Sequence, residues 1–220
     1  AMSDFPKELD IPTSSATMKT LRYKQDSIHD FAWFADKRWH VLKGEVELPI
    51  SKRKVTTWSF FTNAEAEMWR KAPEYISNGI LYMSNWVGEY PYSTCTVVDV
   101  TYASGSGMEY PMITAIGNYG SAFELDVTIA HEIFHNWFYG LFGINERKHP
   151  WMDEGMNSYY DDKYKKAKYG EQVKLERLAF ETKSVTKTDQ PIELSSEKYG
   201  EANYGLVAYY KTAEWVRYLE

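Results

Sequence analysis

SAFELDVTIAHEIFH, residues 121–135, is the stretch of sequence that decides the fold. Ser121, followed three residues later by Glu124, forms the capping-box pattern with which helices begin. Residues four apart on a helix differ by about 40° in direction, so the imidazoles of His131 and His135 point to one side. The sequence therefore predicts a helix that presents two histidines together.

Two neutral imidazoles on one helix face can bind the same metal ion. Glu132 lies beside them, placed to hold and deprotonate a water molecule on the metal rather than to bind the metal itself. A catalytic zinc ion takes three protein ligands and leaves one position for water. Glu154 supplies the third ligand, because it follows His135 after eighteen residues and starts a helix predicted over residues 153–168. We therefore predict one zinc ion held by His131, His135 and Glu154.

These residues resemble the signature of a known family, the gluzincin zinc aminopeptidases typified by aminopeptidase N and leukotriene hydrolase. That signature is H-E-x-x-H followed, after eighteen residues, by Glu. The family also carries a G-x-M-E-N motif upstream of the first histidine. Here the corresponding motif keeps Met108 and Glu109, whereas Ser106 and Tyr110 depart from the usual Gly and Asn.

The resemblance implies roles for residues around the metal. Glu109 would bind the free α-ammonium group of the substrate, with Gly107 and Met108 as neighbouring substrate contacts, since a charge-assisted pair is strong in a partly desolvated cleft. Downstream, the family places a catalytic tyrosine two residues before a lysine. This tyrosine is Tyr209, which would donate a hydrogen bond to the oxyanion of the tetrahedral intermediate. Tyr204, five residues earlier, is a further implied substrate contact.

The implied activity is that of a zinc-dependent aminopeptidase, which hydrolyses the N-terminal bond of peptides with metal-activated water. Two alternatives stay open: a zinc endopeptidase of the thermolysin type, and a non-catalytic peptide-binding relative that keeps the fold. The expected partners are peptides with a free amino terminus and the flanking domains of a longer protein. Residues 1–220 are expected to be a single catalytic domain cut from that protein, and weakly active alone.

The predicted class is α+β, in which an N-terminal mixed sheet precedes a helical half carrying the zinc site. The resemblance implies the thermolysin-like zincin arrangement for it. Enrichment in β-branched and aromatic residues predicts strands at residues 17–24, 40–48, 54–61, 94–102 and 112–116. Helices are predicted at 27–36, from Pro73 onward and after residue 203, with loops at 103–107 and 183–203. Asp161 and Asp162, beside Lys163, are interpreted as a solvated helix face.

Composition excludes some classes of function. The formal net charge is −6 and no long basic block is present, which argues against a nucleic-acid partner. No run approaches the roughly 18 apolar residues needed to span a bilayer, so we expect a soluble protein, either cytoplasmic or exported with its leader removed. Aromatic residues make up 16% of the chain and are expected mainly in the core. The single Cys95 is expected to be a buried, unreactive thiol.

Overall fold

A five-stranded mixed sheet forms the N-terminal half of the protein, which we describe from a computed structural model over residues 17–18, 20–102, 106–171 and 175–220. The strands lie in the order β1-β2-β3-β5-β4. Their bounds are β1 (His40–Glu47), β2 (Lys54–Phe61), β3 (Thr94–Asp99), β4 (Gly107–Met108) and β5 (Ile113–Ile116). The inner pairs β2–β3 and β3–β5 are parallel, and the outer pairs β1–β2 and β4–β5 are antiparallel. The predicted N-terminal mixed sheet is confirmed.

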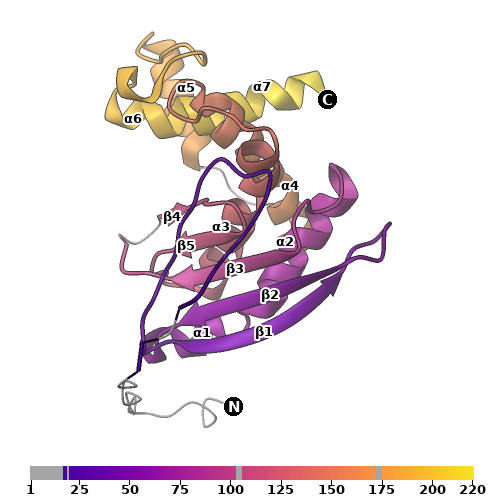
Figure 1. Cartoon of the computed structure of the whole chain (residues 1–220). Coiled ribbons are helices and arrows are strands. Elements are labelled where there is room, and N and C mark those ends of the chain that lie inside the picture. The colour runs from indigo at the N-terminus through magenta and orange to yellow at the C-terminus, as the bar shows by residue number, and fades with distance from the viewer. Residues whose placement is uncertain (1–16, 19, 103–105, 172–174) are drawn as a thin grey trace.

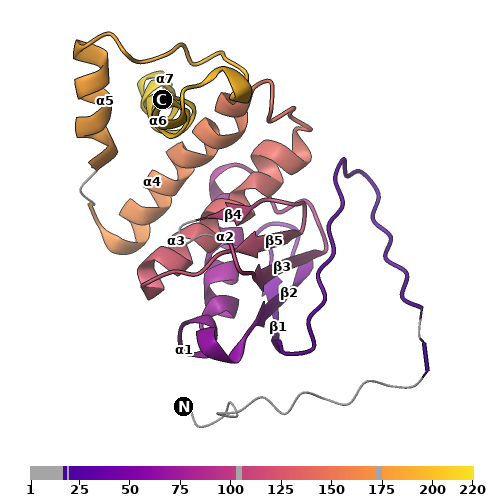
Figure 2. The same cartoon turned by 90° about the vertical axis from the view of Figure 1, so that its left-hand side faces the viewer.

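Helices fill one face of the sheet and then form the C-terminal half of the chain. The helix α2 and the helix α3 lie against one side of the sheet, and residues 20–39 run along the other side (Figures 1 and 2). The α-helices are α1 (Ala66–Trp69), α2 (Ala72–Trp86), α3 (Ala122–His135), α4 (Met156–Tyr169), α5 (Leu175–Val185), α6 (Glu201–Asn203) and α7 (Thr212–Leu219). Short 3-10 turns are η2 (Asn63–Glu65) and η5 (Ser196–Lys198), and π-helical segments are η3 (Asn136–Leu141), η4 (Trp151–Gly155) and η6 (Tyr204–Lys211). The α+β class is thereby confirmed.

The core lies between the sheet and the pair α2–α3. Pro73 stands in the first turn of α2, where a missing backbone N–H costs nothing, as predicted. The largest fully buried side chains are aromatic, namely Trp69, Trp137, Tyr90, Tyr164, Phe61, Phe134 and Phe138. Cys95 is also buried, and burial raises the pKa of its thiol to about 12. Within the described residues, no helix is both long enough and apolar enough to cross a membrane.

Two predictions for the N-terminal segment are wrong. The described residues of 17–24 form no strand, and residues 27–36 form no helix. Ser27 has a φ of 60°, which a right-handed helix does not allow. The segment is instead tied to η3, because His29 Nε2 lies 3.0 Å from the carbonyl oxygen of Tyr139, whose hydroxyl donates to Asp30 at 3.2 Å. These distant contacts override the local propensity.

The two predicted loops are shorter than expected. Residues 103–105 lie outside the described part of the chain, and Gly107 already belongs to β4, where it pairs with Ile116. The loop predicted at 183–203 begins inside α5, a helix that the sequence interpretation missed. None of the residues of α5 is buried, so this helix has no core-packed face of the kind that apolar periodicity identifies.

Candidate metal centre and active site

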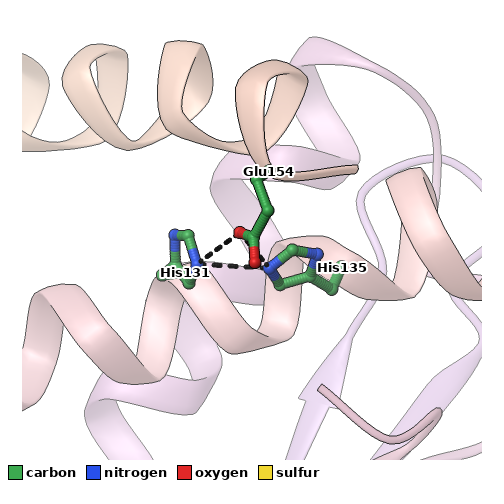
Figure 3. A group of neighbouring side chains, drawn as sticks. All are labelled: His131, His135 and Glu154. Atoms are coloured by element: carbon green, nitrogen blue, oxygen red, sulfur yellow. Dashed lines mark hydrogen bonds and ion pairs between the residues drawn. The ribbon is translucent and has the colours of Figure 1, made fainter. Parts of the chain in front are cut away.

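The helix α3 positions the two histidines of the H-E-x-x-H stretch. The Oγ atom of its N-cap Ser121 accepts a hydrogen bond from the backbone of Glu124 at 3.2 Å, so the helix begins at the predicted capping box. His131 and His135 lie in its last two turns. Their Nε2 atoms are 3.2 Å apart and face the same space (Figure 3).

Glu154 enters this space from the neighbouring segment η4. Its Oε2 atom lies 3.4 Å from Nε2 of His131 and 3.3 Å from Nε2 of His135 (Figure 3). Gly155, the next residue, lets η4 approach the C-terminal helices, since a Cβ atom there would lie 2.6 Å from the carbonyl oxygen of Ala208. Close packing of η4 thus fixes the direction of the Glu154 side chain.

The geometry of the three side chains fits a zinc ion. Tetrahedral zinc with ligand bonds of about 2.0–2.2 Å separates its ligand atoms by about 3.3–3.6 Å. The observed separations among the two imidazole nitrogens and the carboxylate oxygen are 3.2, 3.3 and 3.4 Å. Two imidazoles and one carboxylate are also a donor set that catalytic zinc prefers. His131, His135 and Glu154 could therefore hold zinc with little rearrangement.

Carboxylates lie behind both imidazoles. The Oδ2 atom of Asp161 is 2.6 Å from Nδ1 of His131, and the Oδ1 atom of Asp153 is 2.5 Å from Nδ1 of His135. Asp161 is 7% exposed and Asp153 is 0% exposed. The interpretation of Asp161 as part of a solvated helix face is therefore wrong, because this side of α4 packs against α3.

The carboxylates make the space between α3 and η4 favourable for positive charge. Burial lowers the pKa of His131, but Asp161 and Glu154 outweigh it and hold that pKa well above the ordinary value. Burial likewise lowers the pKa of His135. Asp153 and Glu154 have the larger, opposite effect, so this pKa also lies well above the ordinary value. The same attraction keeps the pKa of Glu154 well below its usual range despite its burial. A cation at this position would be stabilised in the same way.

Glu132 faces the cavity beside the two histidines. It is 5% exposed, and its Oε2 atom has no hydrogen-bond partner among the described residues. Gly107 of β4 makes room for it, since a Cβ atom on Gly107 would lie 2.1 Å from Oε1 of Glu132. Burial raises the pKa of Glu132 above the ordinary value for a glutamate. A carboxylate with a raised pKa is suited to accept and return a proton near neutral pH.

The strand β4 brings Glu109 to the same cavity. Glu109 follows the strand directly and is 7% exposed, and burial raises its pKa. Met108 pairs with Ala115 of β5, and its carbonyl oxygen accepts a hydrogen bond from Thr114 at 2.8 Å. Among the described residues, Gly107 and Glu109 line the cavity and Met108 does not. Met108 therefore fixes the backbone next to Glu109 through the pairing of β4 with β5.

Tyr209 reaches the site from η6. Its hydroxyl donates to Oε1 of Glu154 at 2.5 Å, and its ring lies nearly parallel to that of His131, with centroids 6.2 Å apart. Burial, together with Glu154, raises the pKa of Tyr209 well above its ordinary value, so the hydroxyl keeps its proton. The ring of Tyr204 lies 5.7 Å from that of Tyr209, edge to face. In the described part of the cavity wall, Tyr209 is present and Tyr204 is not.

A single cavity of about 930 Å³ joins these groups. Its wall includes most of the residues singled out in the sequence, namely Gly107, Glu109, His131, Glu132, Glu154 and Tyr209. They come from a strand, a helix and two π-helical segments that are far apart in the sequence. The fold therefore collects candidate metal ligands, further buried carboxylates and a tyrosine hydroxyl at one place.

Residues 78–220 match the family model described as the Peptidase family M1 domain. This chain belongs to peptidase family M1. The match begins within α2 and includes every strand and helix that contributes to the cavity. The family membership predicted from the sequence is confirmed.

The M1 chain is also similar in fold to solved peptidases. The M1 zinc metallopeptidase from Deinococcus radiodurans is 16% identical with a TM-score of 0.58, over 80% of this chain and 38% of that one. A variant of that enzyme bound to a Tyr-Ser-Ala substrate gives 14% identity and a TM-score of 0.53, over 80% and 38%. Legionella pneumophila aminopeptidase A, solved with aspartic acid, gives 16% identity and a TM-score of 0.62, over 82% and 22%. No curated protein sequence matches the chain.

The M1 chain spans less than half the length of these solved enzymes. At such low identities the likeness concerns the fold alone. Both enzymes are called peptidases, and the Deinococcus enzyme is called a zinc enzyme, which agrees with the zinc ion expected here.

Three residues of the site were missed in the sequence interpretation. Asp153 precedes Glu154, and Asn157 and Asp161 follow it by three and seven residues. That spacing places the last two on the same helix face as Glu154. Asn157 donates to the carbonyl oxygen of His131 at 2.8 Å, which joins α4 to α3. The spacing of these residues was therefore visible in the sequence. Their role could be recognised only once the position of α3 beside α4 was known.

Proposed function

We propose that this M1 domain is a zinc-dependent aminopeptidase that removes single residues from the amino terminus of peptides. The proposal is carried by the convergence of two imidazoles and a carboxylate at zinc-like separations in a cavity that also holds Glu132 and Glu109. The names of the similar structures support it, since one is an aminopeptidase and another is bound to a short peptide.

In this proposal His131, His135 and Glu154 hold one zinc ion. Zinc, when bound, supplies Lewis acidity, which polarises the scissile carbonyl and lowers the pKa of water from 15.7 to about 7. Glu132 accepts the proton of the attacking water at its free carboxylate oxygen and returns a proton to the leaving amine. Its burial supports this role, because a raised pKa lets the carboxylate accept a proton and then release it near neutral pH.

Glu109 sets the register of the substrate in the proposed reaction. A buried carboxylate in a cavity pairs well with an ammonium group, so the free amino terminus would bind there and place the first peptide bond over the metal site. Gly107 leaves room for the side chain of Glu132 beside this position. Met108 keeps the backbone next to Glu109 in position through the pairing of β4 with β5.

Tyr209 is the proposed donor to the oxyanion. Its protonated hydroxyl already lies beside Glu154, so a small rotation would direct it to a carbonyl oxygen in the cavity. Tyr204 supports the ring of Tyr209 through their edge-to-face contact. We further propose that residues 1–220 are one catalytic domain of a longer multidomain protein, whose flanking domains complete the cleft and increase its activity.

The decisive experiment compares one aminoacyl fluorogenic amide with its N-acetylated form, on the zinc-loaded chain. Hydrolysis of the free-amine substrate alone is expected, because acetylation removes the charge that Glu109 would bind. Preference for the acetylated form, or for internal bonds of a longer peptide, would identify a thermolysin-type endopeptidase. Stoichiometric zinc with no hydrolysis across a peptide library would identify a non-catalytic peptide-binding protein.

A further inference from the structure

The two carboxylates behind the imidazoles carry an inference about how the metal site is held in shape. We propose that Asp153 and Asp161 are positioning residues, each of which fixes the tautomer and the rotation of one metal-binding histidine. The inference rests on the zinc site proposed above. It concerns residues that do not themselves touch the metal.

The hydrogen bonds define one tautomer for each ring. An ionised carboxylate only accepts hydrogen bonds, so a nitrogen at 2.5–2.6 Å from it must carry the proton. Nδ1 of both histidines therefore keeps its proton, and Nε2 is the nitrogen that can give up its proton to bind a metal ion. Both Nε2 atoms face Glu154, which is the arrangement that a shared metal ion requires.

Asp153 and Asp161 have few other hydrogen-bond partners, unlike carboxylates in ion pairs that stabilise the fold. Oδ2 of Asp153 and Oδ1 of Asp161 are buried and make no hydrogen bond within the described residues. By contrast, Asp126, also buried between α3 and α4, accepts from Lys168 at 2.6 Å, Tyr164 at 2.9 Å and Tyr169. Burying a carboxylate that has only one hydrogen-bond partner is costly, so this arrangement is poor for stability alone. It becomes favourable when a cation is bound on the other side of the imidazole.

One segment of the chain supplies all these groups. Residues 153–161, in η4 and α4, carry the third ligand Glu154 and both positioning carboxylates. Asn157, between them, donates to the carbonyl oxygen of His131 and so fixes the segment along α3. The position of one helix therefore sets the ligand and the orientation of both histidines together.

The test measures zinc affinity with a competing chelator and thermal unfolding with and without zinc. Asp153→Ala and Asp161→Ala are expected to weaken zinc binding by about 10–100-fold each. The increase in Tm that zinc causes should shrink in the same variants. Asp153→Asn and Asp161→Asn keep the size and an acceptor oxygen, so they are expected to recover part of the lost affinity, and they serve where an alanine variant fails to fold.

Asp126→Asn is the structural control. It should lower Tm equally with and without zinc and leave the zinc affinity unchanged. Zinc affinity at the wild-type level in all four variants, or losses of Tm that resemble those of the control, would overturn the inference. Failure of the wild-type chain to bind zinc would instead overturn the proposed function, so the two failures are distinguishable.

Discussion

At the scale of single residues, Glu132 separates metal binding from proton transfer. Its carboxylate faces the cavity beside the histidines but is not one of the three converging ligands. Glu132→Gln preserves the shape of the side chain and removes its ability to accept a proton. We expect one zinc ion per chain by metal analysis, with turnover reduced about 10²–10⁴-fold.

A matched control for this variant is Glu67, an exposed residue of the helix α1. Glu67→Gln makes the same chemical change far from the cavity and should leave turnover unchanged. Cleavage by Glu132→Gln at the wild-type rate would show that another group accepts the proton. Loss of zinc from the variant would show that Glu132 belongs to the metal site itself.

Cys95 provides a second prediction at this scale. It is 1% exposed within β3, and burial raises the pKa of its thiol to about 12. Because the thiolate is the reactive form, labelling by a thiol reagent at neutral pH should be slow in the folded protein and complete in denaturant. Rapid labelling of one thiol per folded chain would contradict the buried position of β3.

At the scale of elements, the parts predicted well are those with local signals. The Ser121 cap and the first-turn Pro73 each mark a helix start by chemistry confined to a few residues. The segment 27–36 was misassigned because its conformation depends on Tyr139, more than a hundred residues away. Asp161 was misassigned for a related reason, since the helix pattern alone does not say which face of α4 meets α3.

The close packing of η4 against the C-terminal helices predicts that a larger residue at position 155 destabilises the protein. Gly155→Ala would place a Cβ atom 2.2 Å from Cγ2 of Thr212 and 2.6 Å from the backbone oxygen of Ala208, so the segment carrying Glu154 must shift. We expect a loss of about 1–3 kcal/mol in the free energy of unfolding, measured with urea, and weaker zinc binding.

Gly205→Ala is the control for that substitution. Gly205 lies in η6, and a Cβ atom there would have nothing within 4 Å among the described residues. Replacing a helical glycine in open space should stabilise the protein by roughly 0.5–1 kcal/mol. Equal effects of the two substitutions would contradict the close approach of η4 to the C-terminal helices.

At the scale of the whole molecule, the site lies where the two halves of the fold meet. Glu109 directly follows the strand β4, α3 contributes the histidines, and the C-terminal half contributes Glu154 and Tyr209. Sequence spacing predicted the two histidines and Glu154, which the structure brings together, whereas Glu109 and Tyr209 were predicted from the family resemblance. It did not predict the carboxylates behind the imidazoles or the shape of the cavity, because both depend on how the halves pack.

The charge of the cavity wall gives the prediction at this largest scale. Among the described residues, Lys165 is the one lysine or arginine side chain in the wall, and the carboxylates there are Glu109, Glu132, Glu154, Asp161, Asp162, Glu176 and Glu201. Burial favours the protonated forms of Glu109 and Glu132, but the five other carboxylates still exceed the combined positive charge of Lys165, a bound zinc ion and a substrate ammonium group. Peptides with lysine after the first residue should therefore have a lower KM than matched peptides with glutamate.

Ionic strength tests whether the preference is electrostatic. The Debye length falls from about 10 Å at 0.1 M salt to about 3 Å at 1 M, so the ratio of kcat/KM for the lysine and glutamate peptides should approach one as salt is added. Glu201→Gln removes one exposed charge from the wall and should lower the ratio at low salt, whereas Glu67→Gln changes the net charge equally and should not. A ratio that stays constant with salt would assign the preference to side-chain shape. A ratio that changes equally in both variants would assign it to the net charge of the protein rather than to the cavity.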